Sequence, residues 1–320
     1  MSYAAHHRVY KRMTHTVLAL LASVAGSADA NAQAICSAPH SSPTLAAGNS
    51  IGTLPRRTGW VMVSALQVST RKTFDSQGDR RPLLADGEFV VRSLYLSSGV
   101  GLARGVDAWA QIPVHRMRYA DVGGERERAG LGDARFALRV GSDLVGRSWP
   151  VAIRAGVKIP GSTFPVDATV IPLTEGQRDA ETSIESGRTF HNNAFYMMGW
   201  VGYRWRSANR AAARRPANEL FSHLAAGTAV AGTRVELGVD LLRAGDPTQL
   251  GFAVPAARRQ LFQLTPTMTR KVGPGDLEFT VVLPAAGRNL PTGAGLSAGY
   301  RVGWDQRRPE LPGSAGFGPP

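Results

Sequence analysis

The sequence contains very little of what several protein classes require. Its 320 residues include one cysteine, Cys36, so no disulfide can form within the chain. No apolar run reaches the ~18 residues that a membrane-spanning helix needs. No segment sustains the i, i+3, i+4, i+7 apolar spacing of an amphipathic helix. These absences exclude a disulfide-stapled scaffold, a helical membrane protein and a helical bundle.

Acidic residues are in the minority, and the formal net charge is +13. A basic balance of this size raises nucleic acid as a partner. The basic residues, however, are scattered singly through the chain, and no run of them exceeds a pair. We therefore expect no binding to nucleic acid.

Patterns for catalysis and metal binding are also scarce. Beyond residue 34, histidine occurs only at positions 40, 115, 191 and 223, and none accompanies a Gly-x-Ser-x-Gly nucleophile turn. There is no His-x-x-x-His pair and no Asp-x-Asp-x-Asp-Gly calcium loop. We expect no catalytic residue, no cofactor and no metal site, with a membrane-embedded hydrolase as a remote alternative.

The N-terminus has the order of a secretory signal peptide. A basic stretch precedes the apolar segment 17–26, and small residues follow it up to a cleavage site after Ala34. We predict a signal peptide over residues 1–34, starting at Met1 or Met13, and a periplasmic leader over residues 35–57. Cys36 is then a free thiol in a flexible leader of an exported protein.

What the rest of the chain has in abundance is period-two alternation, which is typical of β-strands. Twelve strands are predicted, at about 58–72, 86–102, 106–118, 131–144, 150–160, 177–189, 194–206, 219–230, 234–244, 259–271, 277–287 and 293–304. The connections alternate between long and short. Short turns at one end, long loops at the other and an even strand count are typical of bacterial outer-membrane barrels. We predict an all-β, up-and-down antiparallel transmembrane barrel over residues 58–304, followed by a flexible tail over 305–320.

Each predicted strand has one apolar face and one polar face. In the strand at 131–144, Phe136 and Leu138 alternate with Arg135 and Arg139. A soluble sandwich also alternates, but its strands average five or six residues, whereas a strand of about ten tilted residues crosses a bilayer. Aromatic residues near the strand ends are expected to form interfacial girdles; they are Trp60, Trp149, Phe195, Trp205, Tyr300 and Trp304.

The polar faces of the strands are expected to line the lumen of the barrel. By strand parity the candidate lumen-lining residues are Asp107, His115, Asp133, Arg135, Arg139, Arg154, Lys158, Glu181, Glu185, Arg204, His223, Arg234, Glu236, Asp240 and Arg301. Two interpretations stay open. The residues form either a salt-bridge network that fills the lumen and fixes strand register, or a polar pore. Glycines and small residues on several polar faces favour the pore.

Several stretches resemble one family of outer-membrane transporters. They are "GLGDARFALRVG" (130–141), "IPLTEGQRDAETSIESGRTF" (171–190), "GWVGYRWR" (199–206) and "LTPTMTRKVGPGDLEFTVVLPAAGRNLPTG" (264–293). That family is identified with the MetA pathway of phenol degradation, and it is loosely similar to the long-chain fatty-acid and aromatic-hydrocarbon uptake barrels. The resemblance implies a porin-like barrel of about twelve strands in the outer membrane of a Gram-negative bacterium. It further implies passive passage of small, hydrophobic or aromatic solutes.

The expected partners follow from this location. They are outer-membrane lipid, lipopolysaccharide bound by loop arginines, a small-molecule solute, and the barrel-assembly machinery through the last strand, Leu296 to Trp304. The alternative function is a structural or interaction barrel with a filled lumen and binding outer loops.

Overall fold

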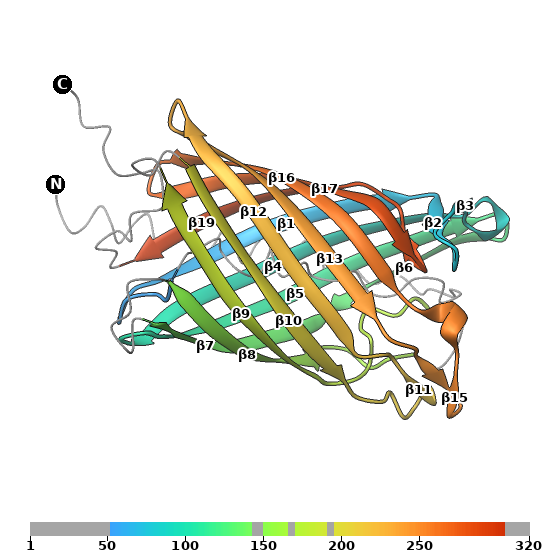
Figure 1. The fold of residues 1–320 in the computed structure, drawn as a ribbon. Helices are drawn as coiled ribbons and strands as arrows, with labels where there is room; N and C mark the ends of the chain where they lie inside the picture. The colour runs from blue at the N-terminus through green and yellow to red at the C-terminus, as the bar shows by residue number, and fades with distance from the viewer. Residues whose placement is uncertain (1–51, 143–149, 166–169, 191–194, 305–320) are drawn as a thin grey trace, which may run out of the picture.

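The computed structural model describes residues 52–142, 150–165, 170–190 and 195–304. The predicted signal peptide, most of the predicted leader and the predicted tail lie outside these residues. Twelve long antiparallel strands close into a barrel (Figure 1). In chain order they are β1 (Gly59–Thr70), β4 (Glu88–Ala103), β5 (Val106–Asp121), β7 (Asp133–Gly141), β8 (Val151–Pro160), β9 (Asp179–Phe190), β10 (Phe195–Arg206), β12 (Glu219–Val230), β13 (Thr233–Ala244), β16 (Gln260–Val272), β17 (Gly275–Arg288) and β19 (Gly295–Trp304). Pairing of β19 with β1 closes the ring.

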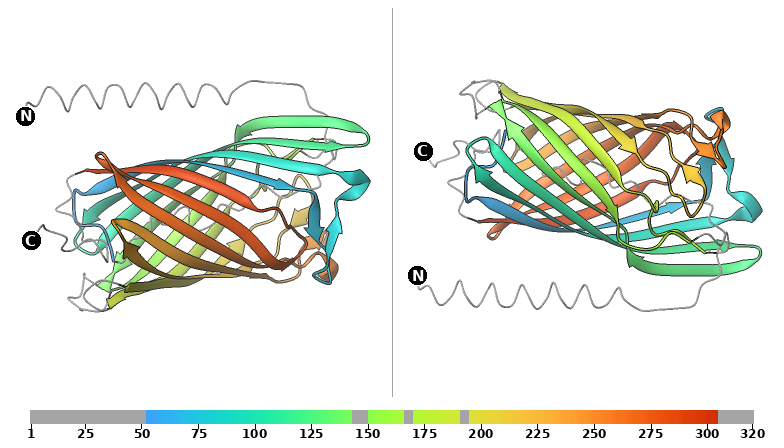
Figure 2. Two further views of the ribbon diagram at one scale, coloured as in Figure 1. Left: turned by 90° about the horizontal axis from the view of Figure 1, so that it is seen from above. Right: turned by 90° about the horizontal axis from the view of Figure 1, so that it is seen from below.

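The predicted transmembrane barrel is confirmed, and each predicted strand overlaps one strand of the ring. The segment 119–130, between the predicted strands 106–118 and 131–144, is expected to be a long loop, and this expectation is wrong. Most of the segment is β6 (Gly124–Leu131), which extends beyond the ring as a hairpin with β5 (Figure 2). Two cross-strand ion pairs hold the hairpin, Arg116–Glu127 at 2.5 Å and Arg118–Glu125 at 2.9 Å. β6 could not be predicted from the sequence, because charged residues occupy both of its faces and it lacks the alternation of apolar and polar residues that indicates a strand.

Short elements gather at the end of the barrel that bears the long connections (Figure 1). One small sheet consists of β2 (Lys72–Phe74), β3 (Arg80–Pro82) and β18 (Leu290–Pro291), and another of β11 (Arg214–Arg215), β14 (Thr248–Gln249) and β15 (Phe252–Ala253). Single 3-10 turns lie at η1 (Leu84–Asp86) and η3 (Pro255–Ala257). In the described part of the chain, no helix is long and apolar enough to cross a membrane.

The barrel is polar inside and apolar outside. On β7, Leu138 is 54% exposed while its neighbour Arg139 is 1% exposed. A similar alternation runs along β8, β10 and β13, where most exposed positions are apolar and the buried positions include the charged residues Arg154, Arg204 and Asp240. Such an inverted pattern is stable where the outward face meets lipid.

Inward-facing glycines let large side chains lie flat against the barrel wall. A Cβ on Gly202 would lie 2.4 Å from the ring of Phe221, and one on Gly99 would lie 2.7 Å from Nε1 of Trp60. Close approach of this kind is a common reason for glycine within a strand. Two expectations are thereby corrected. The space over these glycines is occupied by aromatic rings, and Trp60 is a buried interior residue rather than part of an outer girdle.

Trp205 and Trp304 do lie on the outside, 49% and 37% exposed, as does Phe195. Trp149 falls outside the described residues.

Candidate functional site

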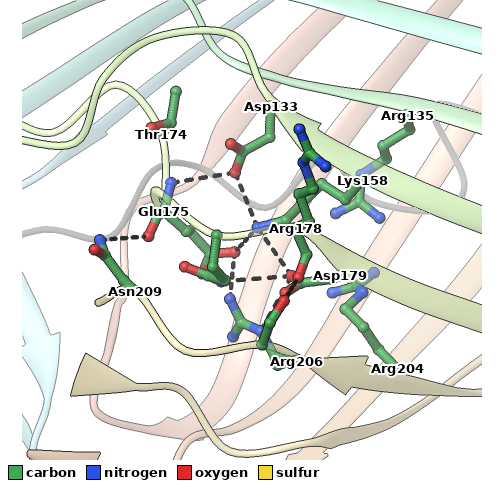
Figure 3. A network of polar contacts seen from close by, with 12 residues as sticks. Asp133, Arg135, Lys158, Thr174, Glu175, Arg178, Asp179, Arg204, Arg206 and Asn209 are labelled. Carbon is green, nitrogen blue, oxygen red and sulfur yellow. Dashed lines mark hydrogen bonds and ion pairs between the residues drawn. The ribbon is translucent and has the colours of Figure 1, made fainter. Parts of the chain in front are cut away.

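A network of buried ion pairs lines the interior near the loop-bearing end, on β8, β9, β10 and β12 (Figure 3). Nζ of Lys158 lies 3.2 Å from Asp133, 2.6 Å from Glu175 and 2.9 Å from Asp179. Removal of charges from water is costly unless each has close partners of opposite sign. The register of β8 and β9, which pairs Lys158 with Asp179, provides that proximity.

The same network continues through two arginines of β10. Arg204 pairs with Glu181 at 3.0 Å and with Glu219 at 2.8 Å. Arg206 pairs with Glu219 at 2.8 Å and also contacts Glu175. Arg135 on β7 joins through Glu181 at 2.9 Å. Alternating charges therefore tie five neighbouring strands together, β7, β8, β9, β10 and β12.

The described residues 170–178 of the β8–β9 connection enter the mouth of the barrel; we call them the mouth segment. Ile171 and Leu173 are each 2% exposed and pack against Leu83, Phe89, Val91, Met117 and Tyr119. Glu175 reaches toward the opposite wall, where Arg259 lies 3.4 Å away. The mouth segment thus crosses the opening from an apolar contact on β4 and β5 to an ionic contact near β10 and β16.

A second charged cluster lies toward the end with the short turns. Arg139 pairs with Asp107 at 2.7 Å and with Glu185 at 3.2 Å. Arg154 pairs with Glu185 at 2.6 Å, and both guanidinium groups lie 4.8 Å from the ring of Trp109. The ring therefore lies close to two cations, an arrangement that cation–π attraction stabilises.

The leader contributes to this cluster. The backbone N–H of Leu54 donates to Asp107 at 2.7 Å, and the Leu54 side chain is 5% exposed among Trp60, Met62 and Trp109. The expectation of a flexible leader is therefore wrong at its C-terminal end, where Leu54 packs against interior residues of the barrel.

A third group of polar residues lies on β10, β12, β13 and β16. His223 bonds to Asp240 at 2.8 Å and stacks on Trp200 with ring centres 4.2 Å apart. Gln263 donates to the other oxygen of Asp240 at 3.1 Å. In the same group, the Tyr196 hydroxyl on β10 donates to Glu236 on β13 at 2.6 Å. These contacts are hydrogen-bonded networks that fix the walls.

The remaining interior wall is lined by short, neutral side chains; we call it the hydroxyl sector. It consists of Ser64, Gln263, Thr265, Thr267, Thr280 and Ser297, from β1, β16, β17 and β19. Among the described residues, Ser64 Oγ and Thr265 Oγ1 have no hydrogen-bond partner. Buried polar atoms in proteins are normally satisfied. Within the described ranges, buried polar atoms without a partner also occur on other walls, among them Tyr95 Oη and Trp200 Nε1, so the hydroxyl sector is distinguished by its short, neutral side chains.

Every predicted lumen residue occupies an inward position of its strand, and most are bonded to one another. The ion-paired residues are Asp107, Asp133, Arg135, Arg139, Arg154, Lys158, Glu181, Glu185, Arg204 and Arg301, the last with Asp276 at 3.1 Å. The others make hydrogen bonds: His115 with Ser93, His223 with Asp240, Arg234 with Thr269, and Glu236 as above. Glu175 was missed, because it lies in a predicted loop and its partners become neighbours only in the closed ring.

A vestibule of about 400 Å³ opens beside the mouth segment, near the ends of β12, β13 and β16. Its lining includes Arg206, Arg214, Glu219, Arg259 and Asn289. Burial lowers the pKa of the Arg214 guanidinium, but arginine remains protonated in proteins. Its volume falls within the ~300–1,000 Å³ of small-molecule sites.

The fold is similar to that of a solved outer-membrane protein. The COG4313 outer membrane channel from Pseudomonas putida F1 superposes with a TM-score of 0.68 at 15% identity, covering 80% of this chain and 98% of that chain. This likeness shows the fold.

Two other solved barrels are more distant. The β domain of the Bordetella autotransporter BrkA has a TM-score of 0.44 at 16% identity, covering 77% of this chain and 98% of that chain. The CymD monoaromatic hydrocarbon channel has a TM-score of 0.39 at 8% identity, covering 78% and 89%. Neither is similar enough to support a conclusion about this chain. No family model and no curated protein matches the sequence, so the resemblance to the phenol-degradation family stays a prediction.

Proposed function

We propose that the protein is a passive outer-membrane channel for small solutes with an apolar or aromatic body. The observation that carries this proposal is the hydroxyl sector, where short side chains replace the long ion-paired residues of the opposite wall. Thr267 and Val282 on this side keep partial exposure inside the ring, whereas Arg139 and Lys158 across from them are 1% exposed. Solutes pass along this sector, beside its short side chains.

The residues beside the hydroxyl sector support the solute class. β1 carries Trp60 and Met62 inward next to Ser64, and Trp60 meets Trp109 edge to face with ring centres 5.2 Å apart. Aromatic and thioether side chains bind apolar bodies, while a few hydroxyls fix their polar groups. An apolar surface made by Trp60 and Met62 beside the hydroxyl of Ser64 fits phenol-like and other aromatic compounds.

The vestibule and the mouth segment set the entrance. Solutes enter through the vestibule, and the mouth segment narrows the opening beside it. Passage needs no cofactor and no energy source, because diffusion through a fixed path requires neither. The same inference places the protein in the outer membrane, with the long loops outside the cell.

A second function, a structural barrel with a filled lumen, is favoured by the extent of the ion-pair network. The two functions can be distinguished with two neighbouring valines whose side chains face opposite sides of the barrel wall. Val282 packs inward against the cluster of Leu66 and Tyr95, and Val281 lies outward beside Leu296. Each is replaced by cysteine in a Cys36→Ser background and treated with a charged, membrane-impermeant thiol reagent.

For a channel, the reagent modifies Val282→Cys and lowers its conductance in planar bilayers. It leaves Val281→Cys unmodified, because lipid covers that position. Absence of conductance together with an unreactive Val282→Cys would establish the filled barrel instead. Heat-modifiable migration of both variants in gels provides the control for folding.

A further inference from the structure

The outer wall of the barrel has a groove of about 580 Å³ across β17, β19, β1 and β4. Its floor is made by two small residues, Ala65 and Ala298, which lie opposite each other on β1 and β19. Bulkier side chains stand on its margins, among them Phe279, 45% exposed, and Leu296, 68% exposed. A small-residue floor between large apolar margins leaves room for an apolar chain.

Two arginines border the groove at the margin nearer the long loops. Arg92 on β4 and Arg116 on β5 are direct cross-strand partners, and both are exposed on the outer wall. Like charges directly opposite on neighbouring strands destabilise a sheet. Arg116 is compensated by Glu127. Within the described residues no carboxylate lies within ion-pair distance of Arg92, whose Nε donates to Gln67 at 3.2 Å. The pair therefore carries an unbalanced positive charge.

The arginines mark the edge of the apolar belt. Toward the short turns, the outward residues after Arg92 are Leu94 and Leu96, and those next to Arg116 are Val114 and Ile112. Toward the loops, charged residues occur among the outward positions, as in Arg118 with Glu125. Because the long loops lie outside the cell, this edge faces the headgroups of the outer leaflet.

We propose that this surface is a binding site for a phosphorylated glycolipid of the outer leaflet, the lipid anchor of lipopolysaccharide. A phosphate group lies between Arg92 and Arg116, since guanidinium binds phosphate through paired, charge-assisted hydrogen bonds. An acyl chain of the same molecule occupies the groove over Ala65 and Ala298. The phosphate relieves the repulsion between the arginines, and the chain covers apolar surface. The site is independent of any solute passage through the barrel.

Native mass spectrometry of the full-length protein in detergent tests the site, with bisphosphorylated lipid A, dephosphorylated lipid A or phosphatidylglycerol added. We expect Arg92→Gln to weaken retention of bisphosphorylated lipid A by about tenfold, the effect of losing roughly one charge-assisted contact. The matched control is Arg270→Gln, which removes an exposed arginine near the other end of the barrel wall and leaves retention unchanged.

A second variant separates the two halves of the site. Ala298→Phe fills the floor of the groove but keeps both arginines, and it is expected to weaken retention to a similar degree. Equal retention by wild type, Arg92→Gln and Ala298→Phe overturns the proposal. So does retention of phosphatidylglycerol or of dephosphorylated lipid A as strong as that of the bisphosphorylated form. Heat-modifiable migration of each variant shows that the barrel has folded.

Discussion

Lys158 and Glu175 form a 2.6 Å ion pair that joins the barrel wall to the mouth segment. Both side chains are almost fully buried, at 1% and 4% exposure. Glu175 also contacts Arg206 and Arg259, so one carboxylate holds the mouth segment to three cations. The apolar side of the segment is held separately by Ile171 and Leu173. The ionic side is therefore the one that can be released without unfolding the wall.

We predict that Glu175→Gln increases conductance. The neutral amide loses charge-assisted contacts, each with a net value of about 1.5–3 kcal/mol, so the mouth segment leaves the opening more often. Single-channel recordings in planar bilayers measure this as longer or larger open events. The control is Asp246→Asn, which removes a carboxylate from the exposed Arg258–Asp246 pair in a loop. A conductance of Glu175→Gln equal to that of wild type would show that the segment does not restrict the path.

The sequence predicts the barrel because outward and inward residues alternate in every strand, whatever the partners are. It does not predict which charges meet. Arg139 finds Asp107 because of the register between β7 and β5. That register shifts by one residue at Gly132, between the pairs Val114–Leu131 and Gln111–Arg135. A bulge of this kind depends on side-chain packing around it, here His115 over Gly132.

Residues beyond the strands were harder still to predict. Leu54 and Glu175 enter the interior from segments without periodicity, and their positions follow from the tertiary structure alone. The aromatic residues illustrate the same limit. Trp60 and Trp205 both lie near strand ends, but only the strand's pairing partners decide that Trp60 points inward over Gly99.

We predict that Arg139→Ala strongly destabilises the barrel. The substitution leaves Asp107 buried without its main counter-charge, and breaking a buried pair in this way typically costs about 3–5 kcal/mol. Urea unfolding in lipid vesicles, followed by tryptophan fluorescence, gives the change in the free energy of unfolding. Asp107→Asn combined with Arg139→Ala is expected to cost less than the sum of the single changes, because the remaining charge is removed as well.

The control for this cycle is Arg104→Ala, in the exposed turn between β4 and β5, which is expected to change stability by within about 0.5 kcal/mol. Additivity of the Asp107 and Arg139 substitutions would contradict the pairing.

We predict that Gly202→Ala destabilises the barrel although it adds only a methyl group. The new Cβ would lie 2.4 Å from Phe221 and 2.6 Å from the carbonyl oxygen of Thr182, so the ring must leave the wall. Displacement of a packed side chain costs about 1–3 kcal/mol. Gly245→Ala is the matched control, because its Cβ meets only Ala217 at 3.7 Å. Equal unfolding free energies for the two variants would show that Phe221 does not lie flat over Gly202.

Two adjacent arginines on β11 provide a test of the vestibule. Arg214 lines the vestibule with Arg206 and Arg259, whereas Arg215 lines an adjoining hollow with Tyr203 and Leu220. Within the described residues no carboxylate lies in ion-pair range of Arg214, so its charge acts on passing ions. Arg214→Gln is expected to shift the reversal potential, measured in a salt gradient, toward cation preference. Arg215→Gln has the same charge change and leaves the reversal potential close to that of wild type. An identical shift for both variants would indicate a general surface-charge effect, and it would exclude the vestibule as the entrance of the path.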